Sequence, residues 1–362
     1  MKKYIIFLAV FLFVHTRIVY SNEYAFITKN AVNITKSTNT VDANVLYSLK
    51  EGDFIEIIES IFNGDIPEWY KVKINNQLGW ITDESVYICH EYKSCELLNA
   101  IANNNIQKTK NLITQGVEVN SGMMRGEVLI TPLIYAIQKG NNEIINLLLE
   151  NGVQIDSGYK YSDTPLTAAI KSKNIKIVKL LIKNGADVNK GTYANYPLRS
   201  AIRINNIEIV GLLIGNSVDI PYNDLLLAVS TANIKLVDII LSTGITFKNY
   251  PSPLPEAVHV YYPNNISEEE RIEMIDFLLS KGLSIDGVDA YNSTVLMHAA
   301  QNRFFNIVKL LIKNNADINL INNEGHDVFD ILEIQIEIAK ERHKTDELNE
   351  YLRIYNFIKN IK

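Results

Sequence analysis

Residues 164–189 read TPLTAAIKSKNIKIVKLLIKNGADVN, and this stretch predicts a pair of short helices. Thr164 can cap the first helix, because its hydroxyl accepts a hydrogen bond from a backbone N–H that has no partner in the helix. Pro165 fits the first helical position, where the N–H that proline lacks would be unpaired anyway. Leu166 and the small Ala169 then face a neighbouring unit, and the alanine lets two helices pack closely.

The second half of this stretch predicts a second helix that ends at a glycine. Ile177, Leu180 and Leu181 fall on one stripe of a helix with 3.6 residues per turn, so we expect all three to face the core. Gly185 then ends the helix in the left-handed conformation, which glycine adopts at little cost.

The same pattern recurs along the chain with a period near 33 residues. VKLLIKNG at 178–185 returns as VKLLIKNN at 308–315, and seven copies of this second helix, the first of them degenerate, end at Gly116, Gly152, Gly185, Ser217, Gly244, Gly282 and Asn315. The opening of the unit recurs at Thr131, Thr164, Tyr196 and Thr294. Such self-similarity indicates a repeat array, in which each unit buries its apolar face only against a near-copy of itself.

The T-P-L-x-x-A openings and L-L-x-x-G-A-D-V-N endings resemble the ankyrin repeat over residues 95–330, in about seven copies with an insertion in the sixth. The histidine usual after T-P-L is replaced by Ile134, Thr167, Arg199 and Met297, which puts its local hydrogen bonding in question but not the packing. The resemblance implies an all-α solenoid that binds a protein through its concave surface and through the loops between repeats, called fingers. Residues 331–362 are expected to form capping helices.

Residues 22–90 have a different pattern, in which apolar and polar positions alternate, as in DFIEIIES at 53–60 and WYKVKINN at 69–76. Alternation of this kind predicts a run of short β-strands. The segment resembles the bacterial SH3 domain, SH3b, through Leu49, Gly52, Trp69, Tyr70, Val72, Gly79, Trp80 and Ile81. The resemblance implies a small all-β SH3-like barrel that contacts peptidoglycan or a peptide. Of its aromatic residues Trp69, Tyr70 and Trp80, we expect Trp80 to pack in the core rather than to bind a ligand.

The first 21 residues, MKKYIIFLAVFLFVHTRIVYS, have the pattern of a secretory signal peptide. Two lysines precede an apolar run that is shorter than the ~20 residues a membrane span needs. We therefore expect an exported protein, in the periplasm, on the cell surface or secreted, with no membrane span after cleavage; an uncleaved anchor is the alternative. Removal of this segment would change the formal charge from −6 to −9, which argues against nucleic acid as a partner.

Cys89 and Cys95 are the chain's two cysteines. In an oxidising compartment they could form a short-loop disulfide, and two reduced thiols are the alternative. His90 between them is weak support for a metal site, because a closed zinc site needs four ligands. We expect no metal.

The sequence has no motif of an enzyme or of a cofactor site: a P-loop, G-x-S-x-G and H-E-x-x-H are all missing. The acidic run SEEER at 267–271 is interpreted as a helix start, in which Ser267 and Glu270 form a capping box. We therefore expect a protein that is not an enzyme and has no cofactor.

Tyrosines recur in one register of the expected fingers. Tyr161, Tyr193 and Tyr291 each lie five residues before the leucine of a repeat opening, and Tyr159 and Tyr250 lie near the same edge. The insertion in the sixth repeat adds His259, Tyr261 and Tyr262. Tyrosine is enriched at the energetic centres of interfaces. These residues are our candidates for partner binding; packing of each tyrosine on the next finger, and neutral drift of the insertion, are the alternatives.

These observations predict an SH3-like barrel followed by an ankyrin-repeat solenoid, in an exported interaction scaffold that binds a protein of unknown identity. A cell-wall-targeted accessory of a peptidoglycan hydrolase is one alternative. A secreted effector that binds a host protein is the other.

Overall fold

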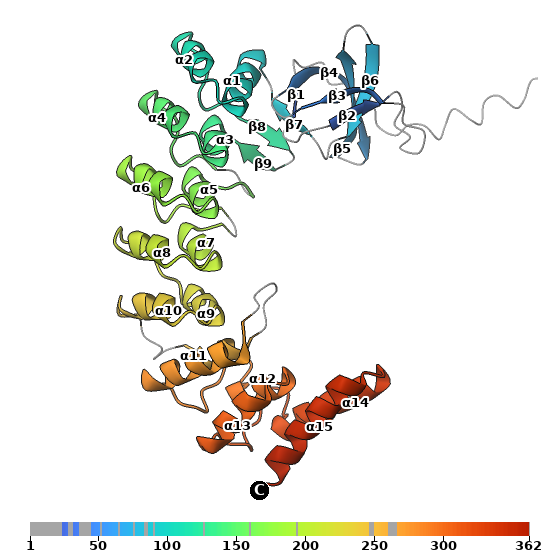
Figure 1. Ribbon diagram of the computed structural model, residues 1–362, viewed down its shortest axis with the longest axis vertical. Coiled ribbons are helices and arrows are strands. Elements are labelled where there is room, and N and C mark those ends of the chain that lie inside the picture. Colours follow the sequence, from blue (N-terminus) through green and yellow to red (C-terminus); the bar gives the residue numbers. More distant parts are fainter. Residues whose placement is uncertain are drawn as a thin grey trace, which may run out of the picture. The chain divides into compact units, whose positions relative to one another are not determined.

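The computed structural model describes residues 24–361 except for 28–31, 36–44, 51–52, 64–65, 75–76, 83–85, 90, 126, 159–160, 193–194, 246–249 and 260–265 (Figure 1). The expected signal peptide at 1–21 lies outside the described residues. The chain divides into two compact units, Met1–Pro197 and Leu198–Lys362.

The first unit begins with antiparallel strands, which we call the β region. Its elements are β1 (Tyr24–Ile27), β2 (Val32–Thr35), β3 (Val45–Leu49), β4 (Phe54–Asn63), β5 (Ile66–Ile74), β6 (Gln77–Thr82) and β7 (Val86–Cys89). With β8 (Met123–Arg125) and β9 (Val128–Ile130) they form a sheet in the order β3-β2-β6-β5-β4-β1-β7-β8-β9. The alternating pattern in residues 22–90 thus predicted the class of structure correctly.

The core of the β region is formed by alternate residues of its strands. The buried side chains are Ile27, Ile34, Ile55, Ile57, Tyr70, Val72, Ile81 and Val86. The described strands do not close into the expected barrel, since β3 and β9 end the order without pairing with each other. Strand β7 cannot complete a ring, because β1 occupies one of its edges and β8 the other.

The β region and the helices are joined by a strand ladder and a disulfide. Ile88 of β7 pairs with Met124 of β8, and β8 and β9 form a hairpin between the first and second helix pairs, as Figure 1 shows. Cys89, at the end of β7, is bonded to Cys95 in the first helix, and both cysteines are fully buried. Because the sheet continues into the first finger, this junction has two independent constraints.

Three helix pairs complete the first unit: α1 (Tyr92–Ala102) with α2 (Ile106–Thr114), α3 (Pro132–Lys139) with α4 (Asn142–Glu150), and α5 (Pro165–Lys171) with α6 (Ile175–Lys183). Thr131 and Thr164 cap α3 and α5 through their side chains, and proline occupies the first turn of each, which confirms the capping prediction. Gly185 ends α6 at φ 91°, also as expected. Leu180 is only partly buried, because Ile177, Val178 and Leu181 form the buried stripe.

The second unit stacks further pairs in two layers. They are α7 (Pro197–Arg203) and α8 (Ile207–Ile214), α9 (Tyr222–Ser230) and α10 (Ile234–Leu241), the 3₁₀ helix η2 (Leu254–Val258) and α11 (Glu268–Ser280), and α12 (Val295–Gln301) and α13 (Phe305–Lys313). First members contact first members, as in α9 with η2 and η2 with α12, and second members contact second members. Where glycine is missing after the second helix, Ser217 and Asn315 adopt the same left-handed backbone, at φ 60° and 62°.

The sixth repeat departs from the others in its first helix, which is reduced to η2 ahead of the insertion. Its second helix, α11, begins with the expected capping box. The Ser267 hydroxyl accepts from the Glu270 N–H, and the Glu270 carboxylate accepts from the Ser267 N–H. Ser267 and Glu270 thus act as the expected helix cap. The Glu268 carboxylate accepts from the N–H groups of Asn306 and Ile307 on α13.

The chain ends with α14 (Val328–Glu341) and α15 (Thr345–Lys359), a longer helix pair that packs like the earlier ones. Helix α14 contacts α12, and α15 contacts α13. His343, between them, has φ 54°, close to the 63° of Arg303 between α12 and α13, so the turn is of the same kind. The expected cap boundary at residue 331 falls inside α14.

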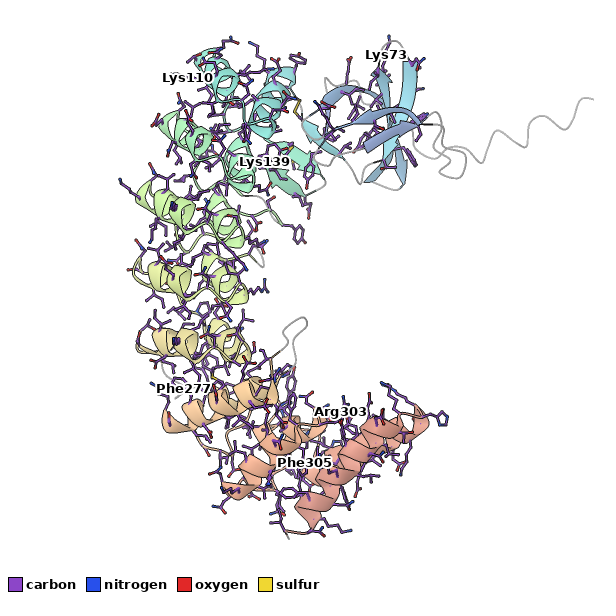
Figure 2. The ribbon with its side chains drawn as sticks, in the orientation of Figure 1. Lys73, Lys110, Lys139, Phe277, Arg303 and Phe305 are labelled. Atoms are coloured by element: carbon purple, nitrogen blue, oxygen red, sulfur yellow. A yellow bond between two sulfur atoms is a disulfide. The ribbon has the colours of Figure 1, made fainter. Side chains whose placement is uncertain are left out.

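Side chains of α13 and of the turn before it attach α15. Arg303 and Phe305 are labelled in Figure 2. Arg303 Nη1 donates to the Tyr351 hydroxyl (3.2 Å), and Arg303 Nε lies 3.0 Å from a Glu350 carboxylate oxygen. The Phe305 ring packs against the edge of Phe357, with 5.4 Å between centroids. None of the described helices is long and apolar enough to cross a membrane.

Candidate binding surface

The finger tyrosines that the structure describes are exposed. Tyr161, in the first unit, is 59% exposed, and Tyr291, in the second, is 74% exposed. Much of each side chain is therefore accessible to a partner. Tyr159, Tyr193, Tyr261 and Tyr262 lie outside the described residues.

The finger that carries Tyr291 is shaped by Asp289. Asp289 Oδ1 accepts from the backbone N–H groups of Tyr291 (2.8 Å) and Ser293 (2.9 Å), which folds residues 289–293 into a tight turn. Its other oxygen, Oδ2, lies 2.8 Å from His298 Nε2 on α12. One carboxylate therefore both forms the finger and ties it to the helix that follows.

The next finger, residues 322–326, repeats this construction 33 positions later. Asn322 Oδ1 accepts from the N–H groups of Glu324 (2.9 Å) and His326 (3.0 Å). The two fingers are bonded directly, because the Asn323 N–H donates to the carbonyl of Tyr291 (3.0 Å). The pair forms one continuous wall.

A pocket of about 290 Å³, which we call the terminal pocket, lies against this wall. It is lined by Asp289, Tyr291, Ser293, Met297, His298, Gln301, Asn322, Asn323, Glu324, His326, Ile331, Ile334 and Gln335. These residues come from the two fingers, α12 and α14. The pocket combines a few apolar side chains with convergent amide, imidazole and carboxylate groups, so most of its lining residues are polar.

His259 is the described member of the insertion group, and it lies beside this pocket. Its ring centroid is 5.8 Å from that of His298. The backbone of His259 is held by Arg271, which is only 2% exposed and donates from Nη1 to the carbonyls of Ala257 (3.1 Å) and His259 (2.9 Å). Burial lowers the pKa of Arg271 from its usual value. His259 and Tyr291 were separate candidates for partner binding in the sequence, and the pocket near both was not predicted.

Residues 97–192 and 264–322 match a family model described as ankyrin repeats (3 copies). The chain contains ankyrin repeats. The β region and the repeats with worn motifs between 193 and 263 lie outside the matched ranges. No curated protein matches the chain. Ankyrin repeats are typically non-catalytic modules that bind proteins, and the terminal pocket lies on the finger side of the last ankyrin repeat and the helix pair after it.

The second unit carries another aromatic group, outside the ranges that match the family model. Tyr250 is 55% exposed and stacks on Tyr222, with ring centroids 4.2 Å apart and planes 8° apart. The Tyr222 hydroxyl donates to the carbonyl of Pro251. Burial first, and then the charges of Glu256 and Tyr250, raise the pKa of Tyr222 to about 12. Tyr250 was selected from the sequence, but Tyr222 was missed because the worn opening of its repeat has no T-P-L motif.

In the β region, Tyr70 is buried but the two tryptophans are not in the core. Trp69 and Trp80 are partly exposed, and Trp80 pairs in register with Lys71, whose ammonium lies 5.4 Å from the Trp80 ring centroid. The expectation of core packing for Trp80 was wrong. Successive residues of a strand face opposite sides, and Ile81 takes the buried position.

Two further residue groups bear on chemistry. Within the described ranges, no group of three or more histidine, cysteine or acidic side chains is arranged to hold a metal ion. Cys89 and Cys95 are joined to each other, so neither presents a thiol.

The residues that sequence reasoning missed are mainly Asp289, His298 and Asn322. The 33-residue spacing of Asp289 and Asn322 was the signal that could have identified them.

Proposed function

We propose that this is an exported scaffold that binds a partner protein through the terminal pocket and the finger side chains around it. The observation that carries this proposal is the pocket itself, bounded by two bonded fingers and by α12 and α14. Its rim includes Tyr291, a large side chain that remains 74% exposed. Exposed aromatic rings beside convergent polar groups are the pattern of an interface centre.

The family match favours a protein partner, because ankyrin repeats are typically modules that bind proteins. At about 290 Å³ the terminal pocket suits a single side chain, and the surrounding finger surface would contact the rest of the partner.

Export is the part of the proposal that rests on the N-terminus and the cysteines. Residues 1–21 have the composition of a signal peptide. The disulfide between Cys89 and Cys95 supports the same location, because such bonds persist in oxidising compartments.

A photo-crosslinking experiment tests the binding site. A benzophenone amino acid at position 291 of the full chain should yield a defined adduct with an envelope or secreted protein. The same group at the exposed Tyr92 on α1, which is 51% exposed, is the control. Identical adducts from both positions, or none from position 291, would exclude the terminal pocket as the site.

The β region supports a second candidate function, attachment to the cell wall. Trp69 and Trp80 share the outer face of β5 and β6, where their partly exposed rings could stack on a glycan or a peptide stem. The full chain would then sediment with purified peptidoglycan, and Trp69→Ala with Trp80→Ala would release it. Equal sedimentation of this double variant would remove the idea.

A further inference from the structure

The terminal pocket has a pronounced charge character. Among its thirteen lining residues there are two carboxylates, Asp289 and Glu324, and neither lysine nor arginine. Each carboxylate has a histidine beside it: His298 Nε2 at 2.8 Å from Asp289, and His326 Nδ1 at 3.4 Å from Glu324. Even with both imidazoles protonated, these four groups would carry no net positive charge. The pocket therefore favours a cation over an anion.

The uncharged lining residues suit one particular cation. Amide oxygens of Gln301, Gln335 and Asn323 can accept hydrogen bonds, and Ile331 and Ile334 offer an apolar wall. Arginine presents five N–H donors in a plane and stacks on aromatic rings, while its aliphatic stem lies along apolar surface. The exposed ring of Tyr291 supplies the aromatic face at the rim. A lysine ammonium would use the carboxylates but fewer of the other groups.

We propose that the terminal pocket binds an arginine side chain of the partner protein. This inference rests on the proposed function and specifies the chemistry of the partner. The net charge of the chain, −6 at pH 7, also favours a basic partner surface, because complementary charge speeds encounter and excludes wrong partners.

The direct test uses N-acetyl-arginine amide as the probe and methyl NMR of the full chain. Methyl groups of Met297, Ile331 and Ile334 line the pocket, and the buried Ile177 of the first unit serves as the internal control. The arginine probe should shift the three pocket signals, with the millimolar affinity expected of one side chain, and leave Ile177 unchanged. N-acetyl-citrulline amide, which has nearly the same shape without the charge, should bind at least tenfold more weakly.

Two variants test the carboxylates. In Asp289→Asn the amide oxygen can still accept from the two finger N–H groups, so the turn is kept while the charge is lost. Glu324→Gln changes a side chain that is 78% exposed and should not affect folding. Each should weaken arginine binding at least fivefold. Binding of citrulline or of the lysine analogue as tightly as arginine, or unchanged affinity in both variants, would overturn the inference.

The crosslinking experiment separates this inference from the function on which it rests. If Asp289→Asn and Glu324→Gln still yield the adduct from position 291 in full amount, the surface binds a protein but not through an arginine. If the chain with the benzophenone amino acid at position 291 and no other change yields no adduct, while the arginine probe still shifts the pocket signals, the proposed function fails and the pocket chemistry stands.

Discussion

Removal of the disulfide should destabilise the β region by a predictable amount. Cys89 and Cys95 are both fully buried and are six residues apart in sequence, so the closed loop is short. The chain-entropy relation gives about 2 kcal/mol for a loop of this length. The double variant Cys89→Ala with Cys95→Ala should therefore lose about 2 kcal/mol, and it should lose it where β7 meets α1.

Urea unfolding followed by tryptophan fluorescence can measure this loss locally. The two tryptophans of the chain, Trp69 and Trp80, both lie in the β region, so their emission reports on that part of the structure. With a denaturant slope of about 2 kcal/mol/M, the midpoint should fall by about 1 M urea. A reductant should lower the midpoint of the unchanged chain by the same amount and have no effect on the double variant.

Two results would refute this reasoning. One is an unchanged midpoint when the native chain is reduced, because a bond that constrains the unfolded state must raise stability. The other is alkylation of both cysteines in the oxidised, folded protein, since a disulfide leaves no thiol to react.

Three further perturbations have defined outcomes. Tyr222→Phe removes the hydrogen bond to a finger carbonyl and should cost about 1 kcal/mol below pH 10. The folded-state pKa of Tyr222 is raised to about 12, above the ordinary tyrosine value of about 10. The contribution of Tyr222 to stability is therefore fully present below pH 10 and is lost as the pH rises through 12. Urea titrations should show the difference in unfolding free energy between variant and parent closing over that interval. Arg271→Met leaves two backbone carbonyls without their donor and should cost about 1–3 kcal/mol, seen as faster hydrogen exchange in η2 and α11; unchanged exchange would contradict the role of this arginine. Tyr351→Phe removes the hydrogen bonds with Arg303 and with the carbonyl of Gln301 and should lower the free energy of unfolding by about 1–2 kcal/mol. Limited proteolysis should then cut α15 earlier than in the parent, and an unchanged cleavage rate would contradict this prediction.

The helix pairs could be predicted because their determinants are local. Thr164, Pro165 and Gly185 act within a few residues of their own positions, so their roles can be inferred from one unit and recognised in the next. The same holds for the capping box of Ser267 and Glu270. The first helix of the sixth repeat was harder, since a second proline, Pro255, follows Pro253 there and the helix is reduced to η2.

The sheet junction and the terminal pocket could not be predicted in this way, because they depend on distant partners. Pairing of Ile88 with Met124 joins a strand to a hairpin across two intervening helices, and neither short segment indicates its partner. The pocket needs Asp289 and Gln335, which are brought together by the stacking of α14 on α12. The tyrosine register found one edge of that pocket, since exposure on a finger follows from repeat position alone.

The bond between Cys89 and Cys95 has a consequence for proteolysis. Lys93 is exposed and lies inside the loop that the bond closes, so trypsin could cut there without separating the products. The nicked molecule would migrate as one species on a non-reducing gel and fall into two pieces only after reduction. An N-terminal fragment could thus remain tethered to the rest of the chain long after the backbone between them had been severed.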